Sequence, residues 1–302
     1  MHRDLELEWS YQRAEAMTAR WAKSFHFASR FLPPAKKRAI FAIYDYCRHA
    51  DNLVDDRGDQ PAATVRAELD GLRDLVRRLH AGARPADARW LALHDTLRRY
   101  PVPLTPLLEL IDGVEMDLGQ VRIPDLATLH RYCRFVAGGV GLMIGPVLGA
   151  ATHELDHAGL EVGLAMQLTN VLRDVREDLD NDRIYLPADE LRAWGLTEAD
   201  LEARRLTPRL RDFLAFQVNR ARQHFTAADR VVPLFPDDGS RLTVRLLERT
   251  YAGILDEIVR MDYDVFRARA YVPFRRKLVI LGRAVYADRI APRRLPEPVP
   301  TA

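Results

Sequence analysis

The stretch AMQLTNVLRDVRED, residues 165–178, sets amide and carboxylate side chains into a dense aliphatic run. On a helix, at about 100° per residue, four of its polar side chains fall within about 60° of one another. These are Gln167, Asn170, Asp174 and Asp178. The aliphatic side chains form a second stripe about a quarter-turn away, whereas a solvated helix places its acids opposite the core. The stretch therefore predicts a helix with a polar row at the rim of a buried space.

A second segment, IFAIYDYCRHADNLVDD at residues 40–56, repeats this design about 120 residues earlier in the chain. Tyr44, Arg48, Asp51 and Asp55 follow one another at spacings of 4, 3 and 4, so they share one narrow stripe of a helix. Both segments thus carry a carboxylate pair at i, i+4, preceded on the same face by hydrogen-bonding side chains.

A solvated acidic face is the alternative interpretation of each row. The same spacing occurs at Asp55/Asp59 and Asp70/Asp74, and a like-charge pair on an exposed helix costs only about 0.2–0.5 kcal/mol. At a buried rim the balance changes, because carboxylates several Å apart repel by roughly a few kcal/mol and also lose their hydration. Two such rows in one cavity would require cations.

The ligand types favour a hard cation. Oxygen ligands with neither His nor Cys suit Mg²⁺ or Mn²⁺. Because Mg²⁺ is commonly held by one or two carboxylates together with substrate phosphate, we expect a phosphorylated ligand. Arg48 and Arg173, close to the rows, are suited to hold its oxygens.

Composition excludes several classes of protein. The chain has 302 residues, 48% of them apolar, and its 45 bases nearly balance its 43 acids, which argues against a nucleic-acid binder. Cys47 and Cys133 have no metal-binding spacing, and the first ten residues lack the apolar core of a signal peptide. We expect a reduced, cytoplasmic compartment.

The fold class follows from periodicity. Amphipathic segments alternate with short breakers, and period-two alternation is nearly absent, so we expect one all-α domain over residues 1–290 with roughly eight to twelve helices. Residues 291–302 are rich in Pro and are expected to be a frayed tail. Thr197 and Thr207-Pro208 are expected to begin helices.

One uncharged run, FVAGGVGLMIGPVLGAA at residues 135–151, is a candidate membrane span. Its 17 residues include five glycines and a proline and lie at the lower edge of the length required, so we expect a buried helix instead. Gly141, Gly145 and Gly149 recur at spacing four. Such a stripe allows close approach of either a neighbouring helix or an aliphatic ligand.

The chemistry that fits these features is ionisation of an allylic diphosphate. The chain contains no GxSxG, P-loop or GxGxxG motif. Cations and arginines would neutralise the departing diphosphate, so that the C–O bond breaks to a carbocation. The carbocation needs cavity walls that exclude water, because water would quench it. The ring faces of Tyr44, Tyr132 or Tyr251 would stabilise the cation.

Four stretches carry a family resemblance. KSFHFASRFLPPAKKRAIFAIYDYCRHADNLVDD (23–56), VAGGVG (136–141), GLAMQLTNVLRDVREDLDNDRIYLPADEL (163–191) and YAGILDEIVRMDYDVFRARAYVPFRRKL (251–278) resemble the squalene/phytoene synthase family. The resemblance covers about residues 17–286. It implies an all-α isoprenoid synthase bundle with a central cavity. There, two prenyl diphosphates condense head-to-head through a cyclopropylcarbinyl diphosphate, with Mg²⁺ (or Mn²⁺) at both aspartate motifs.

The resemblance assigns roles by position. It implies metal ligands at Asp51, Asp55, Asn170, Asp174 and Asp178. It implies substrate-binding residues at Lys23, Ser24, Tyr44, Arg48, Gln167, Arg173, Arg183 and Tyr251. The four aspartates and Tyr132, which matches a tyrosine near the reacting carbons, are the implied catalytic residues. Residues 183–185 match a flap that closes over the site. Trp21-Ala22 stands where some relatives carry His-Ser, so one diphosphate contact is either lost or moved to the backbone.

Three stretches narrow the subfamily. ASRFLPP (28–34), DVREDLDNDRIYLP (174–187) and RAYVPFRRKL (269–278) look most like bacterial phytoene synthases. These implied relatives join two geranylgeranyl diphosphates to phytoene through prephytoene diphosphate, without NADPH, in carotenoid biosynthesis. A greasy substrate of this kind is compatible with peripheral contact at the inner membrane.

Other functions stay open at this point. Dehydrosqualene, hydroxysqualene and squalene synthases share the metal motifs but act on farnesyl diphosphate. A helical scaffold protein of the same fold typically lacks one or both aspartate rows, and both rows are present in this chain. Head-to-tail prenyltransferases and terpene cyclases carry DDxxD or NSE-type motifs, which are not seen here.

Overall fold

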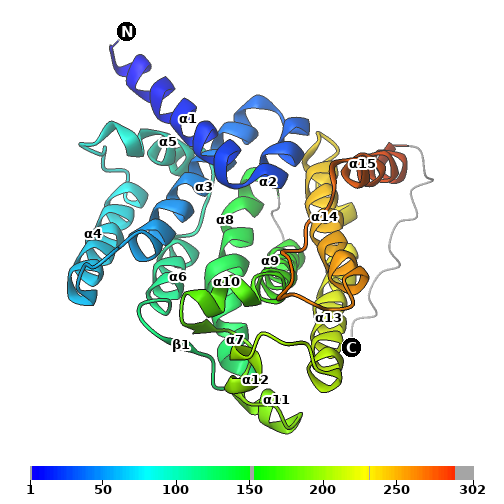
Figure 1. Cartoon of the computed structure of the whole chain (residues 1–302). Coiled ribbons are helices and arrows are strands. Elements are labelled where there is room, and N and C mark those ends of the chain that lie inside the picture. The colour runs from blue at the N-terminus through cyan, green and yellow to red at the C-terminus, as the bar shows by residue number, and fades with distance from the viewer. Residues whose placement is uncertain (1, 150–152, 231, 290–302) are drawn as a thin grey trace, which may run out of the picture.

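The computed structural model describes residues 2–149, 153–230 and 232–289, and α-helices dominate this part of the chain (Figure 1). The helices are α1 (His2–Trp21), α2 (Lys23–Ala28), α3 (Pro34–Asp55), α4 (Ala62–His80), α5 (Leu91–Arg99), α6 (Leu104–Glu115), α7 (Leu126–Cys133), α8 (Gly139–Leu148), α9 (His153–Arg173), α10 (Val175–Asp180), α11 (Ala188–Ala193), α12 (Glu198–Glu202), α13 (Pro208–Asp229), α14 (Ser240–Arg260) and α15 (Phe274–Arg289). The all-α prediction is confirmed. The expected number of helices was too low, because several of the helices are only one or two turns long.

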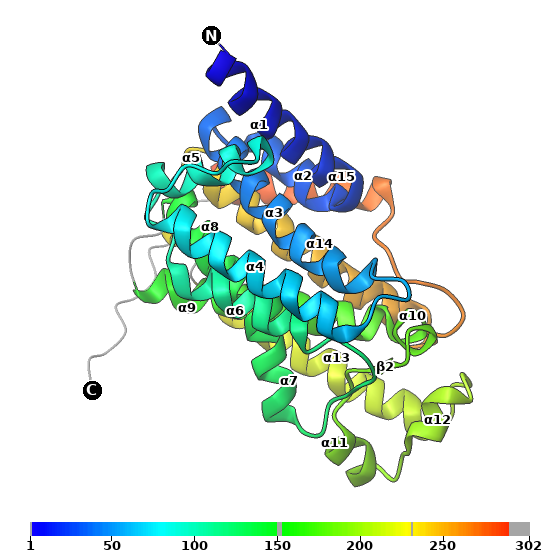
Figure 2. The same cartoon turned by 90° about the vertical axis from the view of Figure 1, so that its left-hand side faces the viewer.

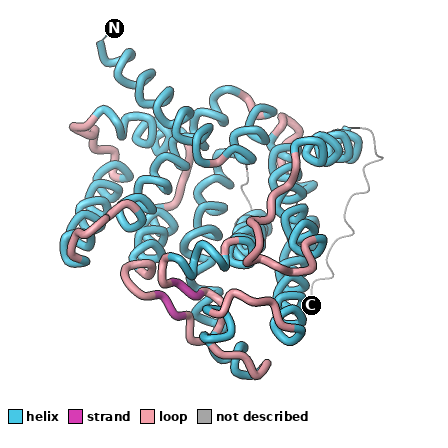
Figure 3. The backbone as a smooth tube through the Cα atoms, viewed as in Figure 1, coloured by secondary structure: helices cyan, strands magenta, loops and turns pink. Residues whose placement is uncertain are grey.

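Regular structure other than α-helix is short. Single 3₁₀ turns precede α3, α5 and α14, and one π-turn, residues 134–138, precedes α8. Two strands, β1 (Val121–Arg122) and β2 (Arg183–Ile184), pair in parallel, with Val121 opposite Arg183 (Figure 3). Because β2 follows directly on α10, this pairing holds the segment after the second acidic row against the chain that leads into α7.

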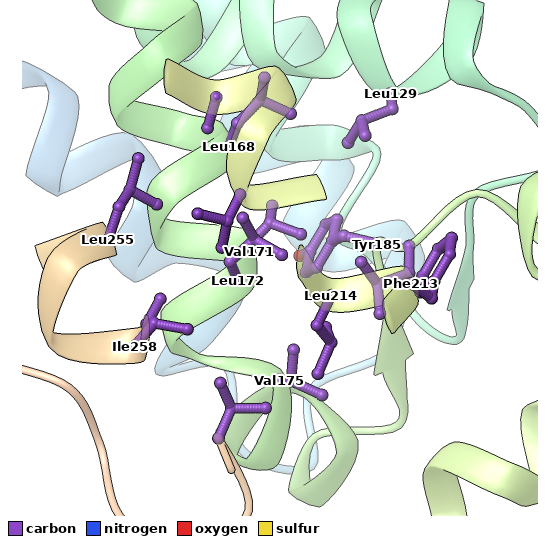
Figure 4. Packing of buried hydrophobic residues seen from close by; sticks show 14 of the residues in the cluster. Leu129, Leu168, Val171, Leu172, Val175, Tyr185, Phe213, Leu214, Leu255 and Ile258 are labelled. Atoms are coloured by element: carbon purple, nitrogen blue, oxygen red, sulfur yellow. The ribbon is translucent and has the colours of Figure 1, made fainter. Parts of the chain in front are cut away.

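Helix α9 lies at the centre of the bundle and contacts α8, α13 and α14. Its apolar face packs with α14 on one side and with α13 on the other (Figure 4). Leu168, Val171 and Leu172 of α9 are all buried there. A second cluster joins α3, α4, α6 and α8, which lie beside one another in two perpendicular views (Figures 1 and 2). Both acidic rows therefore lie on helices whose apolar faces are packed in a core.

The expected helix starts are present. Thr197 and Asp200 form a capping box at α12, and the Thr207 hydroxyl accepts a hydrogen bond from the Leu210 amide at α13, with Pro208 in the first turn. Each such cap satisfies amide groups that the helix itself leaves without partners.

The prediction of a single helix over residues 165–178 was wrong in one respect, because the helix is interrupted at Asp174. Asp174 has φ −103° and ψ 9°, outside the helical range, although its amide still bonds to the Asn170 carbonyl. On a regular helix, side chains at i and i+1 diverge. The break lets Arg173 and Asp174 meet, with 2.8 Å between Nε and Oδ1.

The glycine-rich run is a helix packed in the bundle. A Cβ on Gly141 would lie 2.3 Å from the carbonyl oxygen of Gly159 in α9, so the two backbones touch. Gly149 has φ +93° and ends α8, while residues 150 and 151 of the run and the tail 291–302 lie outside the described residues. Among the helices in the described part of the chain, none is long and apolar enough to cross a membrane.

Candidate active site

A cavity of about 750 Å³ opens between α2, α3, α8, α9 and α14. Its walls are largely apolar and include Val140 and Ile144 of α8 and Val244, Leu247 and Ile254 of α14. A second cavity of about 270 Å³, much more polar, adjoins it. The two share a set of lining residues: Arg48, Asp51, Val136, Gln167, Asn170 and Arg173. The site is thus a largely apolar cavity joined to a smaller compartment that is lined by carboxylates and guanidinium groups.

The structure places all fourteen of the sequence-predicted site residues on the walls of these two cavities. The larger cavity alone is lined by Lys23, Ser24, Tyr44 and Tyr251. The smaller one alone is lined by Asp55, Tyr132, Asp174, Asp178 and Arg183. Both are lined by Arg48, Asp51, Gln167, Asn170 and Arg173. Apart from Tyr44, the two polar rows therefore face one compartment, from α3 on one side and from α9 and α10 on the other.

Two carboxylates of this compartment have raised pKa values. Burial raises the pKa of Asp51 to about 7, and the carboxylates of Asp55 and Asp117 act in the same direction. The Asp51 side chain is still 39% exposed, and it lines both cavities, so its carboxylate remains accessible. Burial, followed by the charge of Asp174, raises the pKa of Asp178 to about 8. Burial in this compartment thus disfavours the charged forms of both carboxylates.

Arginines bind the remaining carboxylates. Burial alone would raise the pKa of Asp174, but hydrogen bonds from Arg173 and Arg269 hold it below its ordinary value. Arg183 donates to Asp55 at 3.1 Å, and Arg48 lies 3.9 Å from Asp51 and 4.0 Å from Asp55. Each acidic row thus has guanidinium groups beside it. A bound anion would compete with the carboxylates for these groups.

The donor set fits a hard divalent cation. Among the described residues, no three His, Cys, Asp or Glu side chains already converge closely enough to hold an ion. The buried Oδ1 of Asn170 nevertheless has no hydrogen-bond partner, because its Nδ2 is turned to Gln167 Oε1 at 3.1 Å. A buried oxygen without a hydrogen-bond partner needs an explanation, and a bound cation would supply a partner for Asn170 Oδ1.

Sequence reasoning missed several residues of the site. Asp117 lines the smaller cavity and accepts hydrogen bonds from the Tyr132 hydroxyl at 2.9 Å and the Tyr185 hydroxyl at 2.6 Å. The two rings stack with centroids 4.9 Å apart. Burial raises the pKa of Asp117 to about 6, although the Tyr185 hydroxyl acts against this shift. No spacing in the sequence links residues 117, 132 and 185, so only the fold reveals the cluster.

The position where the chain departs from some relatives has a contact of its own. The guanidinium of Arg48 lies 4.6 Å from the centre of the Trp21 ring, a cation–π arrangement. Trp21 and Ala22 both line the larger cavity. Trp21 therefore contacts a predicted substrate-binding arginine. Lys277, also missed, lines the cavity and donates to Ser24 Oγ at 3.2 Å.

Comparison with solved structures defines the class of protein. A dehydrosqualene synthase bound to a ligand is 27% identical, with a TM-score of 0.85 over 94% of this chain and 98% of that one. A squalene synthase from Alicyclobacillus acidocaldarius is 28% identical, with a TM-score of 0.78 over 86% and 96% of the two chains. The fold is therefore that of the helical isoprenoid synthases.

Sequence comparison then gives the family. The squalene/phytoene synthase family model matches residues 18–276, and the chain belongs to this family. It is 42% identical to a 15-cis-phytoene synthase of Synechococcus elongatus over 91% of this chain and 92% of the relative. It is 39% identical to a phytoene synthase of Arthrospira platensis over 93% and 94%. The resemblance drawn from the sequence motifs is confirmed.

Proposed function

We propose that the protein condenses two molecules of geranylgeranyl diphosphate head-to-head to phytoene, through prephytoene diphosphate. The observation that carries the proposal is the joining of the two cavities, one lined by carboxylates and guanidinium groups and the other largely by apolar side chains. A diphosphate head and a prenyl tail require such a pair of environments. The relatives at about 40% identity that are named phytoene synthases favour the C20 substrate.

In this proposal the first chemical step is heterolysis of the allylic C–O bond, with the electron pair leaving on the diphosphate oxygen. Arg48 and Arg173 line both cavities, so they can hold the diphosphate while its tail lies in the larger one. Lys23 and Ser24 line the larger cavity beside them and add donors. Donors placed where charge develops lower the barrier most when water is excluded.

The metal ligands would be Asp51, Asp55, Asn170, Asp174 and Asp178. Mg²⁺ or Mn²⁺ bound there would supply positive charge to the departing diphosphate. No reductant is required for phytoene, since two substrate molecules form the proposed product by loss of two diphosphates and two protons.

The walls of the larger cavity protect the carbocation. Val140, Ile144 and Leu247 offer no nucleophile, and the rings of Tyr44 and Tyr251 border the same space. Burial raises the pKa of Tyr251, with Asp174 acting in the same direction, so its hydroxyl stays neutral. A neutral phenol presents an electron-rich face without a competing anion.

One incubation tests the proposal: purified protein with Mg²⁺ and either the C15 or the C20 diphosphate, each with and without NADPH. A C40 hydrocarbon from the C20 substrate, independent of NADPH, is expected. A C30 product formed only from the C15 substrate would replace it with the dehydrosqualene, hydroxysqualene or squalene synthase alternative. The fold is shared with such synthases, so the assay decides on product mass.

Two variants test the residues. Asp51→Asn and Asp174→Asn are expected to lose nearly all product while retaining the helical circular dichroism of the wild type. Full activity in either variant contradicts the assigned metal site. Prenyl diphosphate binding that is unaffected by metal, with no product, would support the scaffold alternative.

A further inference from the structure

Exposed hydrophobic side chains gather on one segment. In the described part of the chain ten large hydrophobic side chains are exposed, and half of them lie between residues 271 and 286. They are Tyr271, Phe274, Leu278, Val279 and Tyr286. Tyr271 is 72% exposed and Phe274 68%, far more than a core-facing aromatic residue. Single exposed hydrophobic residues need no explanation, but a cluster of this size does.

Helix α15 separates two kinds of side chain. Its inner side packs against α14 and α2 through Ile280, Leu281 and Ala284. On a helical wheel its outer side carries the four exposed hydrophobic residues of α15 interleaved with Arg275 and Arg283. We call the following set the α15 face: Tyr271, Phe274, Arg275, Leu278, Val279, Arg283 and Tyr286.

The α15 face is positive. Residues 265–287 contain six basic residues and no acid, whereas the whole chain has a net charge of only +2. Arg275 and Arg283 form no ion pair with any described residue. The nearby acids are already engaged: Asp288 with Arg241 at 2.5 Å, and Asp256 with Arg276 at 2.6 Å.

This surface adjoins the larger cavity. Tyr271 and Lys277 line that cavity, and Lys277 ties α15 to Ser24 at the start of α2. In two perpendicular views α2 and α15 lie at the same end of the molecule (Figures 1 and 2). Trp21, 47% exposed, also lines the cavity where α1 gives way to α2.

We propose that the α15 face docks on a lipid surface that carries anionic headgroups. A helix that lies in the membrane interface combines aromatic and aliphatic side chains, which enter the acyl boundary, with arginines that meet anionic headgroups. A second copy of the chain fits less well. A two-fold interface would set the α15 face against itself, so that Arg275 and Arg283 would meet other arginines with no acid to pair with.

The docked orientation would serve substrate entry, a role that rests on the proposed function. With α15 on the lipid, Tyr271 and Lys277 bring the cavity lining to the membrane surface. A prenyl tail that partitions into lipid would then enter the larger cavity without crossing water.

The test is sedimentation of the full chain with vesicles, without substrate, so that its failure is separate from failure of the proposed activity. The probes are vesicles of phosphatidylcholine alone and of phosphatidylcholine with phosphatidylglycerol. Wild type is expected to bind the anionic vesicles, more weakly at high salt, and to bind the neutral ones at least tenfold less tightly. The triple variant Phe274→Ser/Leu278→Ser/Val279→Ser is expected to lose binding by at least tenfold. Arg275→Gln/Arg283→Gln is expected to weaken it by about fivefold per arginine, the equivalent of about 1 kcal/mol each near an anionic surface.

A matched control uses exposed hydrophobic residues far from α15. Leu5 and Trp9 of α1 are 63% and 51% exposed, and Leu5→Ser/Trp9→Ser is expected to bind vesicles like wild type. Circular dichroism checks that each variant is folded. The proposal is overturned if wild type stays in the supernatant, or if the α15 variants and the α1 control bind alike. It is also overturned if the α15 variants change the molecular mass in sedimentation equilibrium without lipid, since the face would then join two copies of the chain.

Discussion

Arg183 donates a hydrogen bond to the Asp55 carboxylate at 3.1 Å, although 128 residues separate them in the chain. The same guanidinium donates to the Asp117 carbonyl at 3.3 Å. Arg183 is held in place because β2 pairs with β1, so this two-stranded sheet positions a base at the end of the first acidic row. The pairing joins the segment after the second row to the first row.

We predict that Arg183→Gln lowers kcat/KM by about 10²-fold, the loss expected when one donor to a developing charge is removed. The matched control is Arg122→Gln. Arg122 lies one residue along the partner strand and pairs with Asp182 and Glu198, but it lines neither cavity. Steady-state kinetics of the two variants should separate them. Equal losses would mean that the small sheet matters only for stability.

We predict that metal and diphosphate stabilise the protein together far more than either does alone. Arg173 and Arg269 hold Asp174, and Arg183 holds Asp55, so Mg²⁺ alone must displace these bases. Inorganic diphosphate alone must bind beside carboxylates. With both present, the arginines bind the anion and the carboxylates bind the metal. Neither ligand then has to displace an ion pair or face an unneutralised charge on its own.

Thermal unfolding with Mg²⁺, with diphosphate and with both measures this coupling. The rise in Tm with both ligands is expected to exceed the sum of the separate rises, and Asp174→Asn is expected to remove the excess. Additive shifts in the wild type would show that the arginines do not compete with the metal.

Helix periodicity explains why so much of the site was accessible from sequence. The direction of a side chain on a helix depends on local spacing, so the rows at 44–55 and 167–178 could be aligned without knowing the fold. Asp117 and Arg269 could not be found in this way, because each reaches the site from a turn or loop that only tertiary packing brings there. The break at Asp174 was missed for the same reason. Its partner Arg269 is 95 residues away, and no local residue signals a helix end.

We predict that Gly163→Ala destabilises the protein by about 1–3 kcal/mol, the usual cost of overpacking. An added Cβ would lie 2.5 Å from the Ala137 carbonyl oxygen and 2.6 Å from the Gly138 Cα, and backbone atoms of the π-turn cannot yield as a flexible side chain would. Urea unfolding measures the loss. Gly71→Ala is the control, since nothing lies within 4 Å of its added Cβ on α4, and it is expected to stabilise by about 0.5–1 kcal/mol. Similar effects of the two changes would contradict the close approach of α9 to the π-turn.

Glu248 provides a pH-dependent prediction outside the site. Its side chain is fully buried in α14, and neither carboxylate oxygen has a hydrogen-bond partner. Burial raises its pKa to about 8, with the Asp229 carboxylate acting in the same direction and Arg249 and Arg245 acting against it. Below about pH 4.5, the ordinary value, Glu248 is protonated in both the folded and the unfolded chain, so it imposes no charge-burial cost. Between that pH and about pH 8 the folded chain binds one proton more than the unfolded chain.

The free energy of unfolding should therefore fall by up to about 1.4 kcal/mol per pH unit across this window, and the loss should be complete above it. Glu248→Gln stays neutral at every pH, so the variant is expected to lack this slope and to gain stability over wild type as the pH rises from 5 to 8. Urea unfolding at several pH values, with exposed Glu202→Gln as the control, measures the difference. A stability difference between Glu248→Gln and wild type that is the same at every pH would mean that Glu248 is already ionised in the folded protein at pH 5, and hence that it is reached by a base or by water.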